Sequence, residues 1–204
     1  MHDPELEAMA PDDLRAGVRV SIASIVWTVA SSVAAVAIGV AAKSLVLLAF
    51  GLTGLLDAAG SSALVVHFGH ALRHEAFSER HERTALRIVT TGLFVIGALV
   101  AAESVRRLVG GDESHSVLAG VVLAGTSAVI LAVLSVRKRK IAGRIPSRAL
   151  LADGWLSATG CLLAIVTVAG TGFASAFHWW WVDPVAALAV ACGAIAVGVV
   201  MARG

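Results

Sequence analysis

Two aspartates stand inside apolar stretches of the sequence and are its strongest candidates for chemistry. Asp57 lies far from either end of the stretch Leu45–Phe68, and Asp153 lies near the start of the stretch Ala149–Gly170. A carboxylate within a bilayer is unfavourable unless it is paired or hydrated, and such residues mark ion or proton pathways. If the two stretches are antiparallel helices, both carboxylates reach a similar depth and could bind one cation or exchange protons with it. Two alternatives stay open: a hydrogen bond between Asp57 and a Ser or Thr of a neighbouring helix, and a helix-capping role for Asp153.

A second group of candidate ligands consists of histidines that follow Asp57. Successive spacings of three and four residues place the first three on one face of a helix, and the fourth has glutamates beside it in the following loop. Imidazoles and carboxylates suit Zn²⁺ and similar divalent ions. A solvated histidine face at the membrane surface explains the pattern equally well. The residues are His67, His70, His74 and His81, with Glu79 and Glu82 beside the last of them.

The elements that position these residues are six apolar stretches. The chain has 204 residues, 58% of them hydrophobic and 15% charged, unlike a soluble domain. Each stretch is long enough to cross roughly 30 Å of hydrocarbon as a helix. We therefore predict an all-α membrane protein, a six-helix transmembrane bundle over residues 20–201 with a cytoplasmic segment, residues 1–19, before it and no soluble C-terminal domain. The stretches are Val20–Ala42, Leu45–Phe68, Leu86–Val105, Val117–Val136, Ala149–Gly170 and Val182–Met201.

The basic residues between the stretches predict how the bundle is oriented. The connection Arg137–Arg148 carries the strongest basic cluster, whereas the fifth connection has neither Lys nor Arg. Positive loops stay in the cytoplasm, so we expect an integral protein of the plasma (inner) membrane with both termini cytoplasmic. Arg106 and Arg107 oppose this orientation, but they can pair with Glu103 within one helix. Because topology explains the basic cluster, no nucleic-acid partner is expected.

Three segments of the chain fall into an order and spacing typical of one transporter family. Ala49–Asp57 aligns with a second helix that reads A-D-x-x-D-S-x-x-D, and Ala149–Gly160 with a fifth helix that reads A-L-x-A-D-x-x-H-S-x-x-D after a basic loop. Asp183-Pro184 matches the pair that opens the sixth helix. By these segments the chain resembles the cation diffusion facilitator family, the proton-coupled exporters of zinc and related divalent metals. The resemblance covers nearly the whole chain and implies a short, transmembrane-only member without the cytoplasmic metal-binding domain of larger ones.

The resemblance also implies a tetrahedral metal site with ligands from the second and fifth helices. Carried over position by position, the four ligands become Thr53, Asp57, Leu156 and Gly160. Asp57 is the one clear ligand, Thr53 could add a hydroxyl, and the two positions of the fifth helix supply nothing. One strong ligand does not hold Zn²⁺ tightly.

Residues near the two empty positions could supply replacement ligands. We expect Asp153 and the hydroxyls of Ser157 or Thr159 to do so, although the family pattern does not include them. The expected function is efflux of a divalent metal cation, Zn²⁺ above all, by proton antiport. The expected partners are the lipid bilayer, the metal ion and a second copy in a homodimer, with no permanently bound cofactor. The missing ligands leave one alternative open, a transport-defective metal-binding or scaffolding membrane protein of the same fold.

An enzyme is not expected from this sequence. We find no nucleophile with an adjacent base at membrane depth. The sequence also lacks a glycine loop of the kind that binds phosphate. Its glycines are instead scattered, as residues that allow close helix packing in lipid would be.

Overall fold

The computed structural model describes residues 11–72, 79–110, 118–143, 148–177 and 179–203. Across these ranges the regular secondary structure is entirely α-helical. Each helix covers most of one predicted apolar stretch, so the all-α bundle of six helices is confirmed. The helices are α2 (Pro11–Ala42), α3 (Leu45–Leu72), α4 (Glu79–Gly110), α5 (Leu118–Ala142), α6 (Arg148–Phe177) and α7 (Val182–Arg203).

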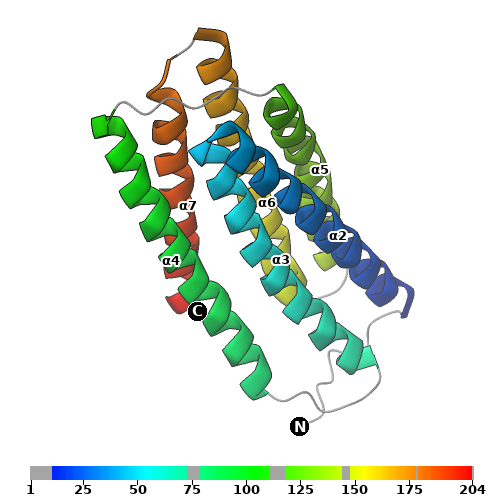
Figure 1. The fold of residues 1–204 in the computed structure, drawn as a ribbon. Coiled ribbons are helices and arrows are strands. Elements are labelled where there is room, and N and C mark those ends of the chain that lie inside the picture. Colours follow the sequence, from blue (N-terminus) through cyan, green and yellow to red (C-terminus); the bar gives the residue numbers. More distant parts are fainter. Residues whose placement is uncertain (1–10, 73–78, 111–117, 144–147, 178, 204) are drawn as a thin grey trace.

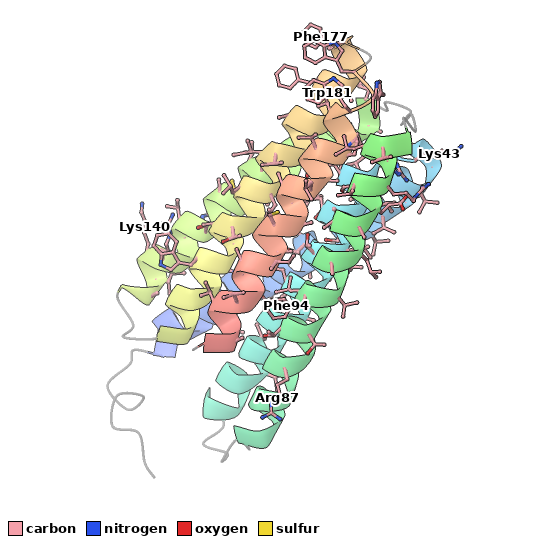
Figure 2. The ribbon with its side chains drawn as sticks, turned by 90° about the vertical axis from the view of Figure 1, so that its left-hand side faces the viewer. Lys43, Arg87, Phe94, Lys140, Phe177 and Trp181 are labelled. Carbon is pink, nitrogen blue, oxygen red and sulfur yellow. The ribbon has the colours of Figure 1, made fainter. Side chains whose placement is uncertain are left out.

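Successive helices run in opposite directions, which gives the bundle two ends (Figure 1). We call the end where α2, α4 and α6 begin the inner end and the opposite one the outer end. In Figure 2, Lys140 lies toward the inner end and Lys43 and Trp181 toward the outer end. The most extensive contacts join α5 to α6, α2 to α3 and α4 to α7. Contacts of α2 with α5, and of α3 with α4, α6 and α7, assemble these pairs into one bundle.

Length and hydropathy of the helices fit a membrane protein. Within the described residues, four stretches are long and apolar enough to cross a bilayer, and α3 adds the shorter apolar run Leu45–Ala59. Large apolar side chains such as Leu99 and Val129 face outward with more than half of their surface exposed. The four long stretches are Ala16–Ala42, Leu118–Ala142, Ser157–Ala174 and Val182–Val200.

The interior of the bundle, by contrast, carries many hydroxyl groups. Such a distribution is expected where lipid takes the place of water outside, because polar side chains then find their partners between helices. In α2, one side of the helix buries five of them, Ser21, Ser24, Thr28, Ser31 and Ser32.

Several helices extend past the predicted stretches. Helix α4 starts at Glu79 rather than near Leu86, and α5 continues to Ala142. The basic residues Arg137–Lys140 are therefore helical and do not form the predicted loop. Hydropathy marks only the part of a helix that is apolar enough for lipid, whereas backbone hydrogen bonding continues beyond it.

Aromatic rings gather at the outer end, where α6 ends and α7 begins (Figure 2). The Phe177 and Trp179 ring centroids are 5.0 Å apart, and those of Trp179 and Trp181 are 5.6 Å apart. About half of the surface of each ring residue is exposed. Stacked, exposed tryptophans at one end of a bundle suit the interface between lipid and water.

Candidate cation site

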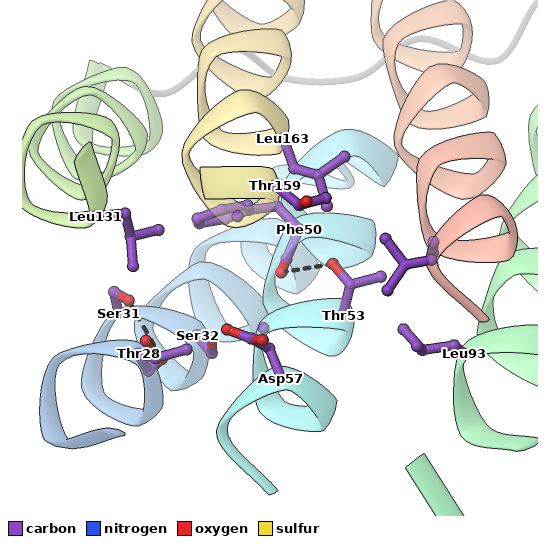
Figure 3. Close-up of a pocket in the computed structure, with 14 residues that line it drawn as sticks. Thr28, Ser31, Ser32, Phe50, Thr53, Asp57, Leu93, Leu131, Thr159 and Leu163 are labelled. Atoms are coloured by element: carbon purple, nitrogen blue, oxygen red, sulfur yellow. Dashed lines mark hydrogen bonds between the residues drawn. The ribbon is translucent and has the colours of Figure 1, made fainter. Parts of the chain in front are cut away.

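A cavity of about 40 Å³ lies inside the bundle, with Asp57 of α3 in its wall (Figure 3). A water molecule needs roughly 10–15 Å³ measured in this way, so the cavity has room for about two or three. Besides Asp57, its polar lining comes from Thr28, Ser31 and Ser32 of α2, from Thr53 of α3 and from Thr159 of α6. Apolar side chains of α4, α5, α6 and α7 close the rest, among them Leu93, Leu131, Leu163 and Val197.

The close approach of α2 and α3 brings the α2 hydroxyls to this cavity. A Cβ atom at Gly51 would lie 2.7 Å from Val36 Cγ2 and 2.8 Å from the Ser32 carbonyl oxygen. A Cβ atom at Gly54 would overlap Ser32 Oγ. Any larger side chain at Gly54 would therefore push α2 away from α3, one turn before Asp57. Small residues at such contacts are the usual means of close helix packing in membranes.

The hydroxyl groups of the cavity have oxygen lone pairs that can accept hydrogen bonds or coordinate a cation. Thr53 Oγ1 donates a hydrogen bond to the Ala49 carbonyl oxygen at 2.8 Å, and Ser31 Oγ donates one to the Thr28 carbonyl oxygen at 3.2 Å. Because each hydroxyl has one proton and two lone pairs, oxygen lone pairs remain for the cavity side. Thr159 Oγ1 of α6 donates to the Trp155 carbonyl at 3.2 Å in the same manner.

The structure brings together part of the predicted ligand set. Asp57 and Thr53 line the cavity, and so do Thr159 and Gly160 of α6. Gly160 contributes open space, since a Cβ atom there would meet only Leu131 Cδ1, at 3.4 Å. Three of the four positions carried over from the family, Thr53, Asp57 and Gly160, thus meet at one cavity, but the one from α6 is a glycine.

Two further predicted residues of α6 are Ser157 and Asp153. Ser157 is absent from its lining, and its hydroxyl accepts a hydrogen bond from Lys138 Nζ at 2.9 Å. Asp153 lies in the second turn of α6, which begins at Arg148, so its predicted capping of the helix start is wrong. The side chains of Asp153 and Leu156 lie outside the described residues.

Three of the four predicted histidines lie on helices at the inner end of the bundle. Helix α3 continues to Leu72, so His67 and His70 are one turn apart on it, as predicted. His81 belongs to α4 and not to the predicted loop. His74 lies outside the described residues, as do the side chains of the other three histidines. Among the residues whose side chains are described, no group of three or more His, Cys, Asp or Glu could hold a metal ion.

A site of this composition offers oxygen ligands only, one carboxylate and several hydroxyls. Such donors bind hard cations through a few direct contacts, and water molecules complete the coordination shell. A single carboxylate can also exchange its proton for a cation, because burial favours whichever partner neutralises its charge. The arrangement is thus suited to transient cation binding.

Sequence reasoning missed two buried charged residues. Lys138 of α5 has 0% of its surface exposed, and its side chain contacts Ser24 of α2 and Ser157 of α6. In the sequence it is one of four consecutive basic residues. Asp183 is 1% exposed, and its carboxylate accepts hydrogen bonds from Ser44 Oγ at 2.5 Å and from the Leu45 amide at 2.7 Å. The Asp-Pro pair marked Asp183, but nothing in the sequence pointed to its partners at the start of α3.

Next to the Asp183 contacts, a further set of contacts at the outer end joins α4 to the turn between α2 and α3. Glu103 pairs with Arg106 at 2.7 Å and with Arg107 at 3.1 Å, which confirms the predicted pairing within one helix. Arg107 also donates to the Lys43 carbonyl oxygen at 2.6 Å. Lys43 joins α2 to α3 with a φ of 53°, a left-handed conformation that is uncommon outside glycine. The turn between α2 and α3 is therefore held from both α4 and α7.

Comparison with known protein families matches residues 21–203 to the cation efflux transmembrane domain. Among curated proteins, no relative matches the chain. The matched residues span all six helices, which agrees with the resemblance inferred from the sequence and with a general function in cation transport across a membrane. The chain therefore belongs to the cation efflux family, as a protein built on its transmembrane domain.

Proposed function

We propose that this protein exports a divalent metal cation, with Zn²⁺ as the first candidate, in exchange for protons. The main support for this proposal is that Asp57 lines a cavity inside the bundle whose other polar residues bear hydroxyl groups. Membership of the family supports cation transport in general. The choice of Zn²⁺ as the transported ion and of protons as the counter-ion rests on the resemblance to proton-coupled zinc exporters. From the same resemblance we propose a homodimer, and from the distribution of basic residues we propose that it lies in the plasma membrane with the inner end facing the cytoplasm.

Asp57 would alternate between a metal-bound and a protonated form. In the inward-open state the ionised carboxylate binds the metal ion, and the hydroxyl oxygens of Thr53 and of α2 supply further contacts. In the outward-open state a proton replaces the metal ion, because a carboxylate in this setting is stable only when its charge is compensated. The return of the protonated carrier then brings the proton into the cell.

The proposal is tested by transport in reconstituted vesicles. Purified protein in proteoliposomes with an acidic interior should accumulate Zn²⁺ from an alkaline exterior, and Asp57→Asn should reduce the rate to that of protein-free vesicles. Glu103→Gln is the matched control, since it makes the same change to a carboxylate that pairs with Arg106 and Arg107 away from the cavity. Equal uptake by the wild type and Asp57→Asn would contradict the proposal.

The second candidate, a metal-binding or scaffolding protein that no longer transports, is favoured by one observation. At Gly160, where related exporters place a carboxylate, the cavity wall has no side chain. Calorimetry on the detergent-solubilised protein separates the two functions. Stoichiometric Zn²⁺ binding that survives Asp57→Asn and disappears when His67, His70, His74 and His81 are replaced would favour the second candidate.

A further inference from the structure

Among the side chains that the structure describes, the largest fully buried one belongs to Lys138, near the end of α5. Its neighbours in sequence, Arg137 and Lys140, are exposed, and Arg139 lies over the Trp155 ring with its guanidinium carbon 5.0 Å from the ring centroid. Lysines near helix ends in membranes ordinarily extend toward water. Lys138 instead turns into the protein, so its position needs a reason other than topology.

The ammonium group of Lys138 is held by hydroxyls of two other helices. Nζ donates to Ser24 Oγ of α2 at 3.0 Å and to Ser157 Oγ of α6 at 2.9 Å. Both serines are almost fully buried. Helix α6 also packs closely against α5 at the base of the Lys138 side chain, since a Cβ atom at Gly154 would lie 2.8 Å from Arg139 Cγ and 3.5 Å from Lys138 Cβ. The position between Ser24 and Ser157 is thus a built cation site.

This site lies directly inward of the cavity that contains Asp57. Ser24 precedes the cavity residue Thr28 by one turn of α2, and Ser157 precedes Gly160 by about one turn of α6. One turn corresponds to about 5.4 Å along a helix axis. Because α5 begins at the outer end and side chains lean toward the start of their helix, the Lys138 side chain leans toward the cavity.

We infer that Lys138 is a tethered cation that occupies the inner approach to the cavity and competes there with the transported ion. The hydroxyls that hold its ammonium group are oxygen ligands of the same kind as those of the cavity, and a metal ion can use them only when the ammonium leaves. Lys138 is therefore a specificity-determining residue that weakens metal binding by holding the hydroxyls of Ser24 and Ser157.

This inference rests on the proposed cation transport, and its test is direct metal binding. Zn²⁺ binding to the solubilised protein is measured by calorimetry for the wild type, Lys138→Gln, Lys138→Ala and Lys138→Arg. Lys140→Gln is the matched control, because it removes the same charge from an exposed position on the same helix end. We expect Lys138→Gln to lower the Kd for Zn²⁺ at least threefold, whereas Lys138→Arg and Lys140→Gln keep the wild-type value.

A second measurement separates competition from simple bracing of the helices. In Lys138→Ala, added n-propylammonium should occupy the vacated site and raise the Kd for Zn²⁺ back toward the wild-type value, with no effect on the wild type. A Kd for Lys138→Gln equal to or above the wild-type value would overturn the inference. Failure of the Gln and Ala variants to fold while Lys138→Arg folds would likewise identify a structural brace.

The outcomes distinguish this inference from the proposed function. Zn²⁺ binding by Lys138→Gln but not by the wild type would support the tethered cation and count against transport of this metal by the native protein. Transport by the wild type with an unchanged Kd in Lys138→Gln would leave the proposed function standing and overturn the inference. Zn²⁺ binding by neither protein would contradict both.

Discussion

Asp183, in the first turn of α7, caps α3 from across the bundle: its carboxylate accepts hydrogen bonds from the Ser44 hydroxyl at 2.5 Å and from the Leu45 amide at 2.7 Å. The first amides of a helix have no partner within the helix, and a carboxylate also interacts favourably with the positive end of the helix dipole. One side chain of the last helix therefore fixes the start of the helix that carries Asp57.

Replacing this cap should destabilise the protein without touching the cavity. Asp183→Ala leaves a buried hydroxyl and a buried amide without their acceptor, which we expect to lower the free energy of unfolding by about 2–3 kcal/mol. Ser44→Ala removes one of these two hydrogen bonds and also the long 3.4 Å bond that the Ser44 hydroxyl accepts from the Leu47 amide, and it should lower the free energy of unfolding by about 1–2 kcal/mol. Unfolding in mixed micelles by increasing denaturing detergent measures both. A smaller loss for Asp183→Ala than for Ser44→Ala would contradict the capping role.

The hydroxyl of Thr53 should matter for cation binding rather than for folding. Thr53→Val keeps the shape of the side chain but removes an oxygen from the cavity wall, and we expect the KM for metal uptake to rise about three- to tenfold. Thr167→Val is a matched control, because Thr167 is also buried and donates to the carbonyl four residues before it, Leu163, at 2.9 Å, but does not line the cavity. Uptake kinetics in vesicles compare the two, and an equal change in both variants would contradict a ligand role.

The space at Gly160 should accept a second carboxylate. Gly160→Asp places an acid on the α6 side of the cavity, where a Cβ atom makes only an ordinary contact with Leu131. We expect the Kd for Zn²⁺ to fall at least tenfold by calorimetry, because two carboxylates then share one cation. The same substitution combined with Asp57→Asn should lose this gain. Unchanged affinity in Gly160→Asp would show that α6 does not face the metal ion.

Close packing at Gly54 should be required for the geometry of the site. Gly54→Ala places a methyl group on Ser32 Oγ, so we expect reduced stability and loss of most metal uptake. Adding Ser32→Ala removes the overlapping oxygen, and the double variant should regain stability. Gly172→Ala is the control, since a Cβ atom there meets nothing within 4 Å. Thermal unfolding measures stability, and a double variant as unstable as Gly54→Ala would contradict this contact.

Much of the fold could be predicted from the sequence, because apolar stretches separated by polar connections directly reflect the bilayer. The helix ends could not, since α4 and α5 continue past their apolar parts. Asp57 and Thr53 could be placed together because they lie one turn apart on one helix. The contributions of Thr28, Ser31 and Ser32 depend on how α2 packs against Gly51 and Gly54, and a single sequence does not show which helices pair.

Buried charge was the least predictable feature. Lys138 looks like any other member of the basic cluster Arg137–Lys140, and only the rotation of α5 in the bundle turns it inward. Ser157 was expected to bind a metal ion and instead holds that lysine at 2.9 Å, in the same part of α6 but one turn from the cavity. The sequence pointed to Asp57 and Thr53, which line the cavity, whereas the rotation of each helix determines which oxygen atoms face the cavity.

Metal-driven proton movement is the most direct test of the central claim, that Asp57 exchanges a divalent cation for protons. Proteoliposomes that contain a pH-sensitive dye are prepared with equal pH on both sides, and a Zn²⁺ gradient is then applied. Inward zinc flow through the wild type should alkalinise the interior, because protons leave in exchange, and Asp57→Asn should abolish this signal. Zinc entry without a pH change in the wild type, or an undiminished pH change in Asp57→Asn, would contradict the account.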